Sequence, residues 1–295
     1  MFSPIIFKQA IIILCLALIP ICSKAQRNGQ EMEDFSYNVG FGIISTSISA
    51  LVNKPKGMKA WPCIRRAMWQ GAMGGALQFA GKKMTYQITR TGYYTWGWAS
   101  KMVNSAGTSI CTNAAMNRPF GSYWALDYAA LHLNIFVDDG HVSFLPQFNI
   151  LFLYDLYCGL YEGHVDWKAS LKTGTFAFKS NSERLGGDGD QRYIMGESWT
   201  RSIIFLGEQY RTPETVSHEI VHTYQVDQFR IFNTCFNPLI NQIRNNTMKG
   251  IFKYVYVEIP YSYPVYGMFY HNDHYYRNPF EFEAELLSSN HAVKR

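Results

Sequence analysis

The sequence predicts an α+β fold: a helical N-terminal part, a short β-meander, and then a strand followed by two helices. Residues 35–130 are mostly apolar helix-forming segments with glycine-rich interruptions. From residue 131 onward, short alternating runs take over, which is typical of strands. A last strand and two helices are expected beyond the polar, glycine-rich stretch at 180–191. Helices and strands are segregated along the chain, which favours α+β over α/β.

Composition excludes several classes of protein. The chain has 295 residues, of which 47% are hydrophobic and 17% charged, so an acidic, aromatic-poor disordered chain is excluded. The formal net charge is +5, and no run of Lys or Arg exceeds two residues. We therefore expect no nucleic-acid partner. The length allows one large domain or two modest ones, and the oligomeric state stays open.

Residues 1–25 have the pattern of a signal peptide. An apolar run at 11–21 is too short for a membrane span, and small residues precede the expected cleavage site after Ala25. A lipoprotein signal with Cys22 as the anchor is the alternative, but isoleucine precedes that cysteine where a small side chain is needed. We expect a protein exported to the periplasm, the cell envelope or the medium.

Export bears on the four remaining cysteines, because thiols oxidise outside the cytoplasm. They can form disulfides in three pairings or stay as buried free thiols, and the sequence leaves both alternatives open. None belongs to a C-x-x-C pair, so a cysteine-based zinc site is not expected. These residues are Cys63, Cys111, Cys158 and Cys235.

Two further apolar stretches, 35–53 and 67–81, are diluted by polar residues and glycines. Both fall short of the roughly eighteen strongly apolar residues that a membrane span needs. Glycine-lined helices packed in a core are the favoured interpretation. A peripheral membrane contact is the alternative.

Strands and helices in the second half follow from local patterns. Residues 131–137 and 141–145 flank an Asp-Asp-Gly turn, which predicts a β-hairpin. Short apolar or alternating runs follow at 148–154 and 170–178, and a strand is expected at 201–207. The remaining helices are expected to begin at Thr212 and at Pro279.

The segment 212–225 carries the clearest chemistry. Thr212 is a favourable N-cap, and Pro213 fits the first turn of a helix. On this helix His218 and His222 lie one turn apart on one face, and Glu219 is offset by about 100°. This is the H-E-x-x-H arrangement, in which two neutral imidazoles hold Zn²⁺ and the carboxylate acts on a bound water. The alternative is an ordinary pair of surface histidines.

Zinc needs a third protein ligand. A metzincin would carry glycine at 225 and histidine at 228, but both positions are glutamine, so that class is excluded. Asp227 points about 140° away from His222 on the same helix. Glu258 lies in an alternating run and is expected on a strand with its carboxylate in solvent. The remaining candidates are Asp273, Glu281, Glu283, Glu285, His271 and His274.

The helix expected from Pro279 favours Glu281. Glu281 and Glu285 are four residues apart and share a face, whereas Glu283 points roughly the opposite way. Small Ala284 permits close approach of another helix. We predict that Glu281 binds zinc, that Glu285 orients a ligating histidine, and that Glu283 contributes little to zinc binding.

These two segments resemble the gluzincin pattern. The pattern is H-E-x-x-H followed by E-x-x-A-[D/E] on a later helix, here at 218–222 and 281–285. The resemblance covers about residues 195–290 and is most like the minigluzincin domains of secreted bacterial proteins. It implies a zinc metallopeptidase in which Glu281 is the third ligand, with Glu285 standing where aspartate is more usual. It also implies that the strand at 202–207 edges the cleft and can pair with an extended substrate.

A zinc hydrolase also needs a donor for the developing oxyanion. The segment 254–276 is rich in tyrosine and histidine, and Tyr270, His271 and His274 are the candidates. A second metal site at His271 and His274 is an alternative to a solvated loop there.

Together the patterns predict an exported zinc metallohydrolase, a peptidase that uses Zn²⁺ and Glu219 as general base on peptide or protein substrates. The predicted organisation is a signal peptide at 1–25, a helical and β-hairpin region of unassigned role at 26–185, and a zincin-like metallopeptidase domain at 186–295. The alternative is an envelope-associated structural or binding protein whose zincin-like scaffold is degenerate or only stapled by metal.

Overall fold

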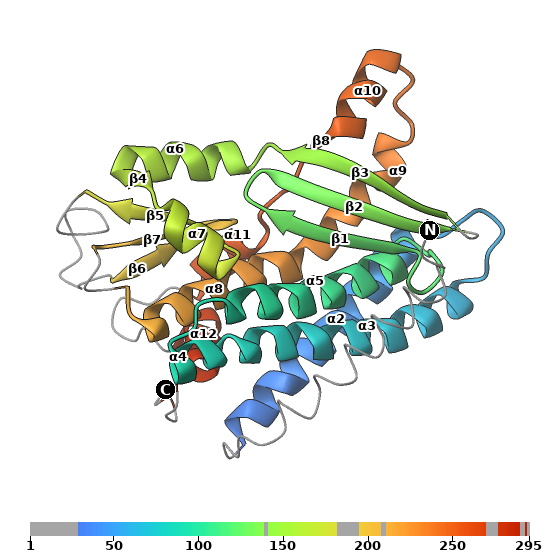
Figure 1. Cartoon of the computed structure of the whole chain (residues 1–295). Helices are drawn as coiled ribbons and strands as arrows, with labels where there is room; N and C mark the ends of the chain where they lie inside the picture. Colours follow the sequence, from blue (N-terminus) through green and yellow to red (C-terminus); the bar gives the residue numbers. More distant parts are fainter. Residues whose placement is uncertain are drawn as a thin grey trace.

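Long helices support two small β-sheets in the computed structural model of the chain (Figure 1). The structure describes residues 29–138, 141–181, 195–207, 211–269, 277–289 and 293. The predicted signal peptide lies outside these residues. Helices come first and the strands of both sheets follow, so the predicted α+β class is confirmed.

The N-terminal helices pack closely through glycines. The helices are α2 (Gln30–Val52), α3 (Ala60–Met84), α4 (Tyr86–Thr91) and α5 (Trp96–Ala115). A Cβ added to Gly71 of α3 would lie 2.4 Å from the carbonyl oxygen of Gly42 on α2, so only glycine permits this approach. Gly74 faces α5 in the same way. The favoured expectation of glycine-lined helices packed in a core is therefore confirmed, and the glycine-rich stretches do not break these helices.

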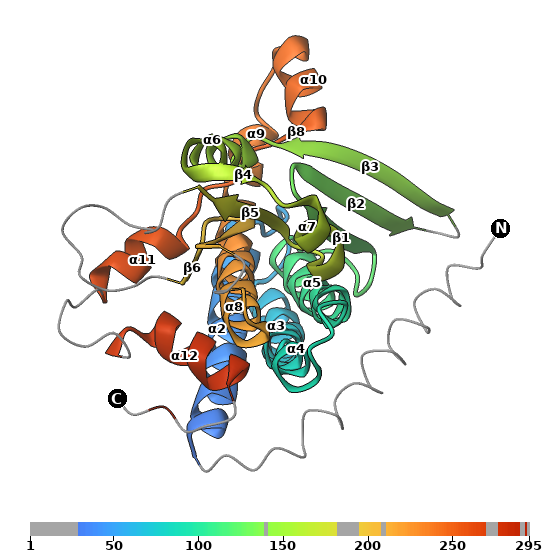
Figure 2. The same ribbon diagram turned by 60° about the vertical axis from the view of Figure 1, so that its left-hand side comes forward.

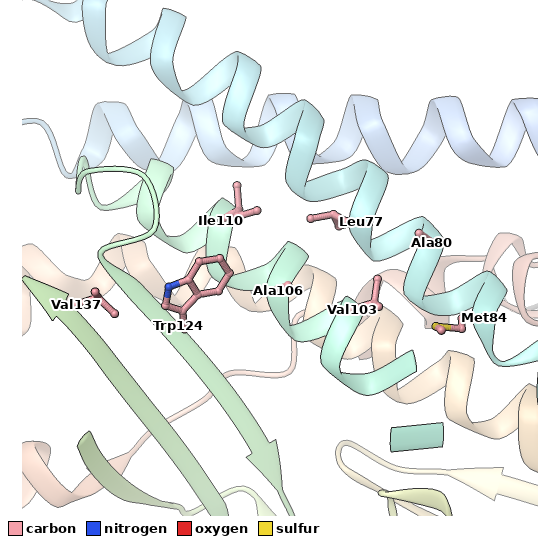
Figure 3. Packing of buried hydrophobic residues seen from close by; sticks show 8 residues of the cluster. All are labelled: Leu77, Ala80, Met84, Val103, Ala106, Ile110, Trp124 and Val137. Atoms are coloured by element: carbon pink, nitrogen blue, oxygen red, sulfur yellow. The ribbon is translucent and has the colours of Figure 1, made fainter. Parts of the chain in front are cut away.

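A hydrophobic cluster lies between α3, α5 and the first sheet. Leu77 of α3 and Val103 and Ile110 of α5 meet Trp124 and Val137 there (Figure 3). The indole of Trp124 also donates to the carbonyl of Gly121 at 3.0 Å, which satisfies its only polar atom. This cluster fixes the first sheet against the helices.

The first sheet has the strand order β1-β2-β3-β8. Its strands are β1 (Tyr123–Tyr128), β2 (Leu131–Asp138), β3 (His141–Asn149) and β8 (Val255–Tyr256). β2 and β3 pair in antiparallel register from Asp138↔His141 to Leu131↔Phe148, which confirms the predicted hairpin. β1 falls inside 35–130, where helix was expected. Gly121 has a positive φ of 71° and turns the chain back, so that Tyr123 and Trp124 are buried as strand residues.

The second sheet has the order β4-β5-β7-β6. Its strands are β4 (Gly163–Val165), β5 (Phe176–Ser180), β7 (Ser202–Phe205) and β6 (Gly196–Ser198). β7 lies between β5 and β6, so the expectation that residues 202–207 edge the cleft is wrong. β6 folds back onto β7 and takes the outer place. The predicted domain boundary at 185–186 lies outside the described residues, and β5 and β7 on either side of it pair directly.

Two short runs expected to be extended are partly helical. The run at 148–154 contains the end of β3 and the start of α6 (Phe152–Glu162). The run at 170–178 contains the end of α7 (Trp167–Thr173) and the start of β5. Asp166 caps α7 by accepting from the Ala169 amide at 2.8 Å, a local signal that the apolar pattern alone does not contain.

The C-terminal part is built around α8 (Pro213–Phe229). As predicted, Thr212 caps it, and its hydroxyl accepts from the Thr215 amide at 3.1 Å. In Figure 2, α8 is seen close to end-on, with the last helix beside it. The elements that follow α8 are a 3-10 helix η2 (Arg230–Phe236), α9 (Asn237–Ile240), α10 (Asn246–Tyr254), α11 (Ser262–Met268) and α12 (Pro279–Ser288).

A cluster of buried charges joins α8 and η2 to both sheets. Glu258 is only 5% exposed and accepts from the guanidinium groups of Arg201 and Arg230. Burial alone would raise the pKa of Glu258, but these two charges outweigh it and lower the pKa. The expectation of a solvent-exposed carboxylate is therefore wrong. β8 ends at Tyr256, so the alternating pattern does not continue to residue 258.

The four cysteines in the described part of the chain are free thiols, and Cys63 and Cys111 are buried. Burial raises the pKa of Cys111 to about 12. The expectation that 35–53 falls short of a membrane span is not confirmed, because one helix among the described residues, α2, is long and apolar enough to cross a membrane by length and composition. Of its most apolar window 33% is buried, and its glycine-bearing face packs on α3.

Candidate metal centre

Two side chains of α8 and one of α12 bring three metal-ligating atoms together. His222 Nε2 lies 3.1 Å from His218 Nε2 and 3.2 Å from Glu281 Oε2, and His218 Nε2 lies 3.3 Å from the same oxygen. With bonds of about 2.0–2.1 Å, ligand atoms of a tetrahedral zinc site are about 3.3 Å apart. The triangle therefore has the size of one face of such a site. It contains all three ligands predicted from the sequence.

The close approach of α12 to α8 places Glu281 in this triangle. Ala284 of α12 is fully buried and packs with Val221 of α8. A larger side chain at 284 would push the two helices apart. The start of α12 is set by Asn278, whose side chain accepts from the Phe280 amide at 3.1 Å, and by proline in the first turn.

Hydrogen bonds on the far side of each imidazole set its tautomer. His222 Nδ1 lies 2.7 Å from Gln225 Oε1, and an amide oxygen can only accept, so Nδ1 carries the proton. His218 Nδ1 faces Glu285 Oε2 at 3.5 Å, as predicted for a carboxylate that orients a ligating histidine. Both Nε2 atoms thus present lone pairs to each other and to the carboxylate of Glu281. Three electron-pair donors facing one point fit a cation, and this donor set suits Zn²⁺.

The charges of the site favour a cation there as well. Burial lowers the pKa of His218, but hydrogen bonds to Glu281 and Glu285 outweigh it and raise the pKa to about 10. Burial raises the pKa of Glu281, but the charges of His222 and His218 outweigh it and hold the pKa well below its ordinary value. The metal-free cluster therefore attracts a proton at neutral pH. A metal ion has to displace that proton, so binding releases it.

Glu219 has the environment of a general base. It follows His218 on α8 and is 6% exposed. Burial raises its pKa, and the charges of His218 and His222 offset part of that rise. Gly196 of β6 lies against it, since a Cβ there would come within 3.1 Å of Glu219 Oε1. β6 therefore covers the carboxylate closely.

Tyr266 is a site residue that the sequence reasoning did not single out. Its hydroxyl donates to Glu281 Oε1 at 2.6 Å, which leaves Oε2 to face the two histidines. Tyr266 lies in the tyrosine-rich segment predicted to supply donors, but no spacing distinguishes it from its neighbours. The named candidates Tyr270, His271 and His274 lie outside the described residues, and so does the alternative second metal site.

Gln225 and Glu283 were also missed as parts of the site. Gln225 contacts His222 directly and donates to Glu283 Oε2 at 2.8 Å. The spacing of three residues between His222 and Gln225 on a helix was a signal that could have shown the first contact. Glu283 is not one of the three ligand residues of the triangle, but it is buried and connected to His222 through Gln225.

Replacing Glu285 by alanine is expected to weaken zinc binding about 10–100-fold, because His218 loses the carboxylate beside its Nδ1. Competition with a chromophoric chelator measures the affinity. Glu214→Ala is the matched control, since Glu214 is an exposed glutamate on the first turn of α8. Equal zinc affinities of Glu285→Ala and Glu214→Ala would show that Glu285 does not orient His218.

The arrangement can carry out metal-assisted hydrolysis. Three protein ligands leave a fourth zinc position for water, as catalytic zinc sites require. Glu219 is a buried carboxylate with a raised pKa on the same helix as the two histidines, and it could take up the proton of such a water.

Comparisons of this chain with models of protein families, with curated proteins and with solved structures gave no match.

Proposed function

We propose that the protein is an exported zinc metallohydrolase, a peptidase of the gluzincin type. The observation that carries the proposal is the triangle of His218, His222 and Glu281, whose three ligand atoms face one another with both imidazole protons turned outward. A bound zinc ion would polarise the scissile carbonyl and lower the pKa of its water. Glu219 accepts the proton of the attacking water and delivers it to the leaving amine. Tyr266 and Glu285 hold the ligands in place.

Cleavage of unfolded proteins and peptide libraries by the purified mature chain, followed by mass spectrometry, tests this function. We expect cleavage that stops when a chelator removes zinc and returns when zinc is added. Full zinc occupancy without cleavage of any substrate would contradict the peptidase and would favour the alternative, a binding or structural protein stapled by metal.

A second candidate function, attachment to a membrane surface, is favoured by the turn between α2 and α3. The turn and the helix ends beside it expose large apolar side chains, among them Trp61 at the start of α3, which is 65% exposed. Tryptophan is enriched at the level of lipid headgroups, and lysine and arginine bind anionic lipids. We call the following residues the α2–α3 tip: Leu51, Val52, Lys54, Lys56, Met58, Lys59, Trp61 and Arg65.

The charge of the helical part suits an anionic bilayer. Residues 35–126 contain no Asp or Glu and ten basic residues, and three of these, Lys56, Lys59 and Arg65, are exposed at the tip. The tip is also remote from the metal centre. From Ala60 at the tip to Lys82, which contacts α12, α3 runs 22 residues or about 33 Å. A bilayer at the tip would leave the metal centre free.

Binding to vesicles that contain anionic lipid tests this second function. We expect Lys56→Glu/Lys59→Glu to lower the partition coefficient about 30-fold or more, because each basic residue near an anionic surface contributes about 1 kcal/mol. Lys168→Glu/Lys172→Glu on α7 is the control with the same charge change at exposed positions. Unchanged partition of the tip variant, or no binding by the unmodified chain, would refute the membrane contact.

A further inference from the structure

A chain of buried hydrogen bonds runs from the N-terminal helices to a metal ligand. We propose that Lys82 of α3 and Glu283 of α12 are positioning residues of the metal centre, which act on His222 through Gln225. The inference rests on the proposed zinc site and not on peptidase activity. It assigns a role to the helical region that precedes the two motifs.

The first step is the contact between Gln225 and His222. Gln225 Oε1 accepts from His222 Nδ1 at 2.7 Å, and this requires the amide to point its oxygen toward the ring. The amide nitrogen donates to Glu283 Oε2 at 2.8 Å and to the Phe280 carbonyl at 2.9 Å. Both partners of the nitrogen are acceptors, so a flipped amide would place its oxygen against two oxygens. Glu283 thus helps to fix the amide orientation that keeps the His222 proton on Nδ1.

The second step is the anchoring of Glu283. Lys82 Nζ lies 2.8 Å from both carboxylate oxygens, and Asn38 donates to Oε1 at 2.7 Å. The Glu283 side chain is buried, so these donors from α2 and α3 replace the water that a carboxylate would otherwise contact. They hold its oxygens in a fixed place beside the Gln225 amide.

The third step is the placement of Lys82. Its side chain is fully buried, and besides Glu283 it donates to Asn38 Oδ1 at 3.0 Å and to Gln228 Oε1 at 2.7 Å. Every proton of the ammonium group thus has an acceptor from α2, α8 or α12. Lys82 holds Glu283 at the position from which it orients Gln225.

A purely structural role does not require this pair. Buried ion pairs can often be replaced by apolar side chains of similar volume without loss of stability, because desolvation offsets their attraction. Here the chain of contacts ends on a metal-ligating imidazole. Partners that orient a ligating histidine typically change metal affinity 10–100-fold. The earlier expectation that Glu283 contributes little to zinc binding is therefore replaced by a positioning role.

Zinc affinity of the full mature chain, measured by chelator competition, tests the inference. We expect Gln225→Leu and Glu283→Gln each to weaken zinc binding about 10–100-fold. Because Glu283→Gln leaves the buried ammonium unpaired and can unfold the protein, Lys82→Met/Glu283→Leu serves as a second variant that removes both charges. It should weaken zinc binding by at least tenfold while the metal-free melting temperature is retained. Lys83→Met is the control, since Lys83 pairs with Glu31 instead.

A second readout reports the His222 ring directly. Nitrogen NMR of the metal-free chain, recorded at a pH high enough for the His222 ring to be neutral, distinguishes the two tautomers, and Gln225→Leu should lower the population with the proton on Nδ1. The inference would be overturned if Gln225→Leu and Lys82→Met/Glu283→Leu bound zinc as tightly as the unmodified chain and kept the same His222 tautomer. The metal site itself would then still stand. Failure of the unmodified chain to bind zinc would overturn the proposed function instead, and the tautomer would still test the positioning.

Discussion

Glu219→Gln is expected to lower the rate of peptide cleavage by about 10²–10⁴-fold while zinc stays bound, because glutamine cannot accept the proton of the attacking water. Glu219 is not one of the three ligand atoms of the triangle, so its amide analogue should leave metal affinity nearly unchanged. Glutamine also keeps the shape that fits under Gly196. The measurement is kcat on a cleavable peptide, together with zinc per chain in the same sample.

Glu214→Gln is the matched control for this experiment. It removes one carboxylate from an exposed position of the same helix, and its kcat should equal that of the unmodified chain. If Glu219→Gln cleaves at an undiminished rate, Glu219 is not the general base. If a cellular phenotype of the protein survives Glu219→Gln, the zincin-like part acts as a scaffold.

Glu281→Ala is expected to remove most of the bound zinc, with an affinity loss above the roughly 100-fold upper range for partners outside the ligand triangle. The reason is that the loss of Oε2 leaves two imidazoles and no carboxylate to balance the charge of the cation. The metal content after dialysis and the affinity from chelator competition both measure the effect.

The ranking of the variants by the amount of zinc they lose also tests the ligand set. Glu281→Ala should lose more zinc than Glu285→Ala or Glu283→Gln, and Glu214→Ala should lose none. A Glu283→Gln variant that is stripped of metal, beside a Glu281→Ala variant that retains it, would show that the triangle is not the ligand set.

Local signals in the sequence were sufficient for the parts of the site that lie on one helix. Thr212 and Pro213 define the start of α8, and the four-residue spacing of His218 and His222 places both on one face. The start of α12 could likewise be predicted from Asn278 and Pro279. Small Ala284 also indicated that another helix approaches there, and the structure shows that this helix is α8, through Val221.

Contacts between segments that are distant in the sequence could not be predicted from such local signals. Periodicity indicates that residue 283 faces away from 281, but it does not show that Lys82 and Gln225 lie there. Glu258 was predicted to face solvent for the same reason. The two arginines that contact it, Arg201 directly before β7 and Arg230 in η2, are distant in the sequence. The order of strands in the second sheet likewise depends on β6 folding back onto β7.

Metal analysis of the purified mature chain is the most direct test of the central claim, that His218, His222 and Glu281 form a zinc site. Native mass spectrometry of the chain after zinc loading and dialysis should show one zinc ion per chain, and His218→Ala/His222→Ala should show none at the same concentration. An unmodified chain that retains no zinc, or a double variant that retains the same single ion, would contradict the account.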